Sequence, residues 1–231
     1  MLVKSLSIAV IFFILFPGVG SAQDDLTKAN SLFETAEALR KIDKADSKRE
    51  AIAKYEESAS IFGALKMRER EATTFNNIGN TYLNLSEYAK ALTALEKALA
   101  ISVDISAAKL EIITLLNMGR TFRLMGRQSD AINKFERAVA VSGEINNKEL
   151  EAAALNGLGA THYSLGDYQS ALSRFEAAST IFIELGQRAS LASLQNNMGI
   201  INRMLGNQEE AIDLYNRART SCGATPLRRS T

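Results

Sequence analysis

Few side chains in this sequence could act as nucleophiles, acid–base catalysts or metal ligands. The chain has one histidine, His162, and one cysteine, Cys222. A Ser-His-Asp or Cys-His arrangement would have to use His162, which stands at an aromatic packing position of a repeated pattern. Zinc sites built from pairs of His or Cys are excluded by these counts. The sequence therefore predicts no catalytic residues, no metal site and no cofactor, and we do not expect an enzyme.

Asparagines have more to offer than the acid–base residues. They interrupt apolar runs such as FNNIGNTYLNL at 75–85, although Asn is a mediocre helix former because its side chain competes for backbone hydrogen bonds. An amide offers both a donor and an acceptor to a peptide unit, which suits the binding of an extended chain. The alternative is that these amides join one structural unit to the next, giving structure rather than recognition.

Arginines accompany these amides on the same predicted helices. Guanidinium groups favour a ligand with acidic side chains or a C-terminal carboxylate. The complete set of candidate partner-binding residues is Asn76, Asn77, Asn80, Asn117, Arg120, Arg123, Asn156, Asn196, Asn197 and Arg203.

The runs that carry these residues recur at a fixed interval. Gly79, Gly119, Gly159 and Gly199 are each 40 residues apart, and such a period is typical of stacked repeats. A second motif recurs in step, as in ALTALEKA from Ala91: an Ala, a large apolar residue four later, then Ala or Ser three after that. This spacing is one face of an amphipathic helix. No proline occurs between residues 23 and 225, so helix is permitted throughout.

Each unit is therefore predicted to be a helical hairpin, with breakers at 85–88, 126–129, 166–169 and 206–209. A glycine inside a helix costs about 1 kcal/mol relative to alanine. We expect close approach of the partner helix to offset that cost, at Ala91, Ala131, Ala171 and Ala211. The pattern predicts ten helices in five pairs, the first pair at roughly 28–41 and 47–65.

This arrangement resembles the tetratricopeptide repeat (TPR) family, whose pattern is a large residue, Leu, Gly, aromatic, then Ala, aromatic, Ala. Two units follow that pattern residue by residue: Phe75, Ile78, Gly79, Tyr82, Ala91, Leu95 and Ala98, and then Leu115, Met118, Gly119, Phe122, Ala131, Phe135 and Ala138. The usual period is about 34. The spacing of 40 is similar to that of the long-helix subclass, which includes kinesin light chains and the repeat arrays of bacterial exported proteins.

The resemblance implies an all-α fold, a right-handed α-solenoid of about five helical hairpins, whose first helices line a concave groove. It also implies that asparagines at the positions of Asn77, Asn117 and Asn197 hold the backbone of an extended peptide. Family members that clamp a carboxylate carry Lys or Arg four residues before the groove asparagine. This chain has Thr73, Ile113 and Ser193 there, so we do not expect a clamp of that kind.

The first 22 residues differ from the rest of the chain. Lys4 precedes an uncharged run of 11 residues, and small residues stand at Gly20 and Ala22, which is typical of a secretory signal cleaved after Ala22. Eleven residues are too few to span a bilayer as a helix, which needs about 20; the alternative is an uncleaved membrane anchor. We expect a signal peptide at 1–22, a TPR solenoid at 23–221 and a disordered C-terminal tail at 222–231, in a periplasmic or secreted protein.

The charges are balanced, with 27 basic and 26 acidic residues and no basic cluster, which argues against nucleic acid as a partner. We expect an exported, non-catalytic scaffold that binds an extended segment of a partner protein, with no membrane span after cleavage and with the oligomeric state left open. The repeats also look like arrays that precede caspase-like CHAT peptidase domains in bacterial proteins. The alternative is therefore the sensor part of a split or truncated CHAT-type peptidase system.

Overall fold

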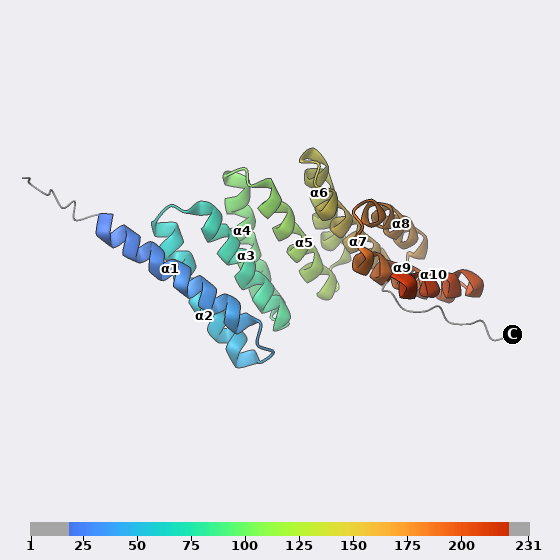
Figure 1. Ribbon diagram of the computed structural model, residues 1–231, viewed down its shortest axis with the longest axis horizontal. Helices are drawn as coiled ribbons and strands as arrows, with labels where there is room; N and C mark the ends of the chain where they lie inside the picture. Colours follow the sequence, from blue (N-terminus) through green and yellow to red (C-terminus); the bar gives the residue numbers. More distant parts are fainter. Residues whose placement is uncertain (1–18, 222–231) are drawn as a thin grey trace, which may run out of the picture.

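The computed structural model describes residues 19–221. Over that range the chain forms ten helices and no strand: α1 (Val19–Arg40), α2 (Ala45–Ala64), α3 (Arg68–Asn84), α4 (Tyr88–Asp104), α5 (Ala108–Leu124), α6 (Gln128–Glu144), α7 (Lys148–Leu165), α8 (Tyr168–Glu184), α9 (Arg188–Met204) and α10 (Gln208–Ser221). Five antiparallel hairpins stack side by side into an elongated body, from α1 at one end to α10 at the other (Figure 1). The predicted right-handed α-solenoid of helical hairpins is confirmed.

Two of the predicted segments fall at the ends of the chain. The expected secretory signal at 1–22 lies outside the described residues except for residues 19–22, which belong to the start of α1. The expected tail at 222–231 lies wholly outside them. Both therefore stay predictions.

The turns between helices share one backbone device. From residue 66 to residue 206, every twentieth residue has a positive φ, between 54° and 84°. Glycines fill four of these positions, and the other four are taken by Lys66, Ser86, Ser106 and Asn146. The residue after each one donates its N–H to a helix carbonyl five residues back, as Glu87 does to Tyr82 at 3.0 Å, which caps the helix end. The predicted breakers therefore coincide with turns, and the junctions between hairpins use the same geometry as the turns within them.

The period-marking glycines make room for large side chains from the second helix of each hairpin. A Cβ added at Gly159 would lie 2.6 Å from the Phe175 ring, and one at Gly199 would lie 2.6 Å from the Tyr215 ring. Burying such a ring stabilises the fold by about 1.5–3 kcal/mol, which exceeds the helix cost of the glycine. The same pairing joins Gly79 to Leu95 and Gly119 to Phe135.

This packing differs from the expectation that an alanine of the second helix faces each glycine. Large side chains supply the nearest atoms at all four crossings, and an alanine is among the three nearest atoms only at Gly79, where the carbonyl oxygen of Ala91 lies 3.2 Å away. The physical reason is that a ring lying flat on a glycine fills the crossing better than two small residues would. The alanines are nevertheless buried.

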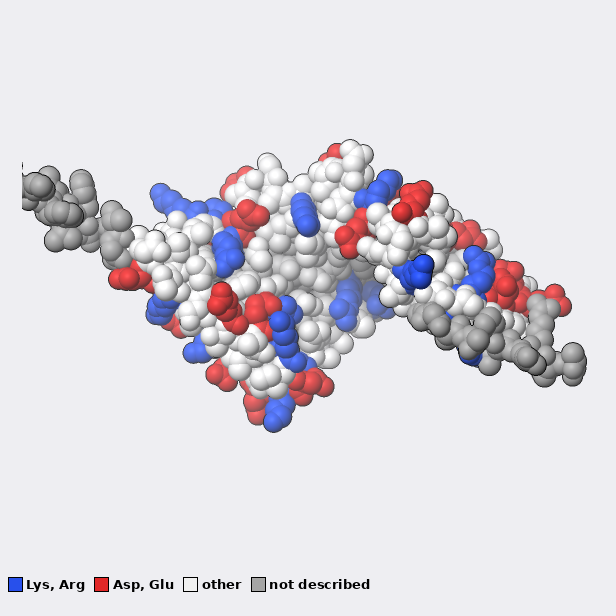
Figure 2. All heavy atoms as spheres, viewed as in Figure 1, with Lys and Arg blue, Asp and Glu red and all other residues white. Residues whose placement is uncertain are grey.

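The odd-numbered helices form one layer and the even-numbered helices the other. Along the odd layer α3 packs on α5 and α5 on α7, while no such packing joins α4 to α6. A stack whose odd helices lie closer together curves towards them, so these helices line the concave side. Figure 2 shows that the face in view is hollowed between α5 and α9, with blue Lys or Arg side chains in the hollow. The predicted groove is thus built from the glycine-bearing helices.

Candidate functional site

The concave side holds a cavity of about 200 Å³ between α5, α7 and α9. Two of the predicted groove residues, Arg123 and Asn197, lie on its wall, and Phe175 of the outer helix α8 reaches it because Gly159 has no side chain. The rest of the lining is mainly apolar. The full set of lining residues is Arg123, Ala160, Tyr163, Ser164, Phe175, Asn197 and Ile200.

The asparagines of the first repeats join neighbouring hairpins. The side-chain nitrogen of Asn77 donates to Oε1 of Glu37 at 2.9 Å, which ties α3 to α1. That of Asn117 donates to Oδ1 of Asn76 at 3.0 Å, which ties α5 to α3. Asn76 is buried and the two donors are half-buried. In this half of the groove the amides therefore act as inter-repeat connections, as the structural alternative supposed, and only the carbonyl oxygens of Asn77 and Asn117 stay available to a ligand.

This ladder of amides stops at α7. The residue one period after Asn117 is Gly157, whose missing side chain leaves room for the Phe135 ring; an added Cβ would lie 2.4 Å from it. Asn156 is half-buried, and Asn196 and Asn197 are exposed. Between residues 19 and 221 no side-chain hydrogen bond of these three amides is found, nor of the half-buried Asn80. The amides free to receive a ligand thus lie mainly on α7 and α9.

The three predicted arginines also lie on this part of the groove. Arg120 and Arg203 are exposed and Arg123 is half-buried, and no carboxylate of the described residues forms an ion pair with any of them. Burial lowers the pKa of Arg123, and the charge of Arg120 lowers it further. A partly desolvated guanidinium without a counterion is costly, so an anionic group placed beside it would be bound favourably.

The N-terminal end of the groove is closed by a network that sequence reasoning missed. Glu37 accepts two hydrogen bonds from Arg40, at 2.9 and 2.6 Å, and one each from Tyr55 and Asn77. Burial alone would raise the pKa of Glu37, but the hydrogen bonds from Arg40 and Tyr55 outweigh it and hold that pKa below its ordinary value. Burial, together with the Glu37 carboxylate, raises the pKa of Tyr55. The signal that could have found Glu37 is its place exactly one period before Asn77.

His162 takes a structural place in the last turn of α7. Its Nδ1 lies 3.2 Å from Oδ2 of Asp167, without the angular geometry of a hydrogen bond. Asp167 caps α8 by accepting from the Ser170 backbone N–H at 3.2 Å; hydrogen bonding with Ser170 is the main cause that lowers the pKa of Asp167. Within residues 19–221 no group of three or more His, Cys, Asp or Glu side chains could hold a metal ion. Nor does any helix in that range have the length and apolarity to cross a bilayer.

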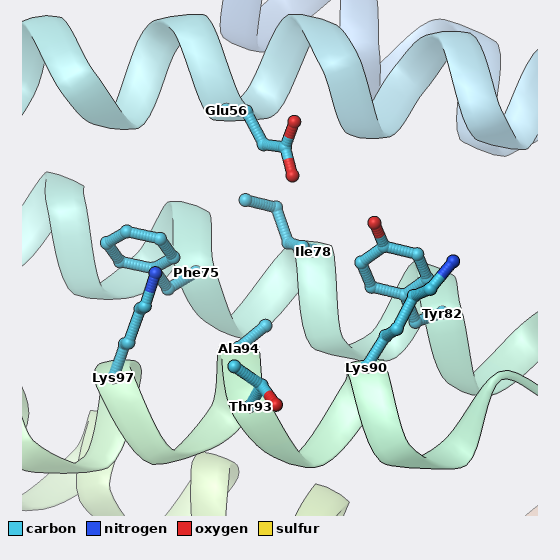
Figure 3. A pocket seen from close by; sticks show the side chains of 8 residues that line it. All are labelled: Glu56, Phe75, Ile78, Tyr82, Lys90, Thr93, Ala94 and Lys97. Atoms are coloured by element: carbon cyan, nitrogen blue, oxygen red, sulfur yellow. The ribbon is translucent and has the colours of Figure 1, made fainter.

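A second, shallower cavity lies on the outer side between α2 and α4, with α3 as its floor (Figure 3). Its volume is about 190 Å³. Glu56 of α2 points into it from one wall, and Lys90 and Lys97 of α4 stand at the two ends of the opposite wall. None of these residues was singled out as a ligand-binding residue from the sequence, because the repeats that the cavity joins meet there only after folding.

The sequence and the fold were compared with known proteins. Two models of the tetratricopeptide repeat match the chain, one at residues 70–143 and 150–222, which is more than half of the sequence, and another at 116–182. No curated protein matches the sequence. A kinesin light chain from Podospora anserina with nearly identical TPR-like repeats shares the fold at a TM-score of 0.68 and 17% identity, over 85% of this chain and 95% of that one.

Two bacterial structures are similar to a comparable degree. BtubC (BKLC) from P. vanneervenii gives a TM-score of 0.70 at 20% identity, over 91% of this chain and 96% of that one. A Rap protein complexed with Competence and Sporulation Factor gives a TM-score of 0.73 at 17% identity over 86% of this chain; the present chain spans only 55% of that protein. The repeat period, the stacked hairpins and the sequence match lead to one conclusion: the chain belongs to the tetratricopeptide repeat family.

Proposed function

We propose that this protein is an exported, non-catalytic scaffold that holds an extended segment of a partner protein in the part of its concave groove formed by α5, α7 and α9. Tetratricopeptide repeats generally build protein-interaction scaffolds rather than active sites, which supports the coarser part of this proposal. The observation that carries the finer part is Arg123: a half-buried guanidinium beside an open cavity, with no carboxylate of the described residues to neutralise it.

The lining suggests how such a segment would be held. An apolar side chain of the partner would rest on Ala160, Phe175 and Ile200, where removal of apolar surface from water favours binding. A neighbouring carboxylate would pair with Arg123, and the amide of Asn197 would bond a peptide unit of the partner. Because stacked helices hold these residues in place before binding, little conformational entropy would be lost.

The comparison with the Rap protein supports the same idea at the level of the fold. That protein was crystallised in complex with Competence and Sporulation Factor, so a solenoid of similar fold can bind a partner. At 17% identity the likeness is one of fold alone, and the proposal for this chain rests on its own groove residues.

The proposed export rests on the leader pattern at residues 1–22. It is tested by expressing the full chain in a host with an export pathway and measuring the mass of the product in each cell fraction. We expect an envelope or secreted product whose first residue is Gln23. A product that keeps Met1 and stays with the cytoplasm would contradict it.

The groove is tested by affinity capture from the envelope fraction of the exporting cell, followed by identification of the captured proteins. The double variant Arg123→Gln with Asn197→Ala should lose the partner that the unaltered protein retains, while its helix content by circular dichroism stays the same. The matched control is Arg174→Gln, because Arg174 is an exposed arginine of the outer helix α8. Equal retention by the double variant and the control would reject the assignment of this groove.

A further inference from the structure

The cavity on the outer side between α2 and α4 combines charges that are not satisfied within the protein (Figure 3). No ion pair joins Glu56 to another described residue, and none joins Lys97 to a carboxylate; the Lys97 ammonium lies 5.1 Å from the centre of the Phe75 ring. Lys90 lies 5.5 Å from the centre of the Tyr82 ring. One carboxylate and two ammonium groups therefore face one cavity without neutralising one another.

Lys90 does have a carboxylate partner, but it shares that partner. Oε2 of Glu87 lies 2.8 Å from Lys90, and Oε1 of the same carboxylate lies 2.7 Å from Arg49. One negative charge between two positive ones leaves a surplus of one positive charge there. With Glu56 and Lys97 counted as well, the lining and its partners carry a net charge of about +1, so a ligand of net charge −1 would complement them.

The equivalent groove one period along shows how such a cation is normally neutralised. Arg137 occupies the position equivalent to Lys97, and it pairs with Glu111 at 2.7 Å. The counterpart of Glu111 in the first groove is Glu71, which is instead held by Arg68 at 2.6 Å. Because Ala108 replaces that arginine in the later repeat, Glu111 is free to reach Arg137. The unpaired state of Lys97 is thus a specific property of the α2–α4 groove.

We infer that this cavity binds a free acidic α-amino acid, with L-glutamate fitting best. The ammonium of the ligand faces Glu56, its two carboxylates face Lys90 and Lys97, and its methylene groups lie on Ile78 and Ala94 at the centre of the floor. Seven residues separate the two lysines on α4, which is about 10 Å along a helix. Two carboxylates joined by a short chain can bridge ammonium groups at that separation, and the longer side chain favours glutamate over aspartate.

The inference does not depend on the concave groove, since the two sites lie on different layers. It is tested by titrating the ¹⁵N-labelled protein with L-glutamate, L-glutamine and N-acetyl-L-glutamate while recording amide NMR spectra. L-Glutamate should give saturable shifts confined to residues near this cavity in α2, α3 and α4. Glutamine lacks the second carboxylate and N-acetylglutamate lacks the ammonium, so each should bind at least about tenfold more weakly, the change for one lost charge-assisted contact.

Variants locate the binding and separate it from a general effect of charge. Lys97→Met keeps the apolar stem over Phe75 and should weaken L-glutamate binding at least about tenfold, whereas the matched variant Arg137→Met in the next groove should leave it unchanged. Glu56→Gln should abolish the preference for glutamate over N-acetylglutamate while the spectrum stays that of a folded protein. Equal binding of glutamine, shifts that do not saturate, or equal effects of the Lys97 and Arg137 variants would overturn the inference.

Discussion

Substitutions at two helical glycines should move stability in opposite directions, although the chemical change is the same. Gly159 lies under the buried Phe175 ring, and an added Cβ would come within 2.6 Å of two ring atoms. Gly143 of α6 has no heavy atom within 4 Å of an added Cβ. Alanine at either site gains up to about 1 kcal/mol of helix propensity, and at Gly159 the methyl group must also displace a ring packed at core density.

The magnitudes follow from these contacts. Overpacking of this kind costs about 1–3 kcal/mol, so after the gain in propensity Gly159→Ala should destabilise the protein by about 1 kcal/mol, and Gly159→Leu by more. Gly143→Ala should stabilise it by about 0.5 kcal/mol, because the last helical turn gives only part of the propensity gain. For a domain of this size 1 kcal/mol corresponds to a shift of about 2–4 °C in Tm.

Thermal unfolding followed by circular dichroism measures these shifts. We expect Gly159→Ala to melt below, and Gly143→Ala above, the unaltered protein. Adding Phe175→Leu to Gly159→Ala should recover part of the loss, since residues in contact do not behave additively. If both alanine variants raised Tm, the ring would not be packed on the glycine, and the account of the hairpin crossing would be refuted.

Three further predictions follow from the groove. Arg123→Met should raise Tm by about 2–4 °C per kcal/mol gained, since it removes an uncompensated charge from a half-buried site; a lowered Tm would mean that the guanidinium is satisfied within the protein. Asn117→Ala should destabilise the protein by about 1 kcal/mol in urea unfolding, because the hydrogen bond between repeats is lost, whereas Asn196→Ala, at an exposed amide, should have no measurable effect. The pKa of Glu37 is depressed in the folded state, so its contribution to stability is present above the ordinary pKa of 4.5 and is lost as the pH falls through the folded value; Tm of Glu37→Gln should therefore lie below that of the unaltered protein at pH 7 and approach it in acid.

The architecture was accessible from the sequence because it is written in spacing. The four glycines at intervals of 40 located each hairpin, and the second motif located its partner helix. The positive φ of Ser86 and Ser106 was not accessible, because serine does not mark a left-handed turn as glycine does. Nor was the contact of each glycine with a ring, which depends on the distance between two helix axes rather than on residue pattern.

The candidate site was only partly accessible for a similar reason. Asn77 and Asn197 occupy the same position in their repeats, yet one is bonded to Glu37 and the other makes no side-chain hydrogen bond with a described residue. Sequence position cannot separate them, because the difference lies in the neighbouring repeat. The cavity itself brings together Tyr163, Ile200 and Arg123 from three different helices, and its existence depends on how far those helices are splayed.

Site-specific photo-crosslinking tests the central claim most directly, since it reports where a partner lies rather than whether one is captured. A photoreactive amino acid is placed at Ile200, on the wall of the concave cavity, and in a second protein at Arg174, on the outer helix α8. After irradiation with the envelope fraction, the groove account predicts a covalent adduct of one partner at position 200 and none at position 174. An adduct of that partner at position 174, with none at position 200, would contradict it.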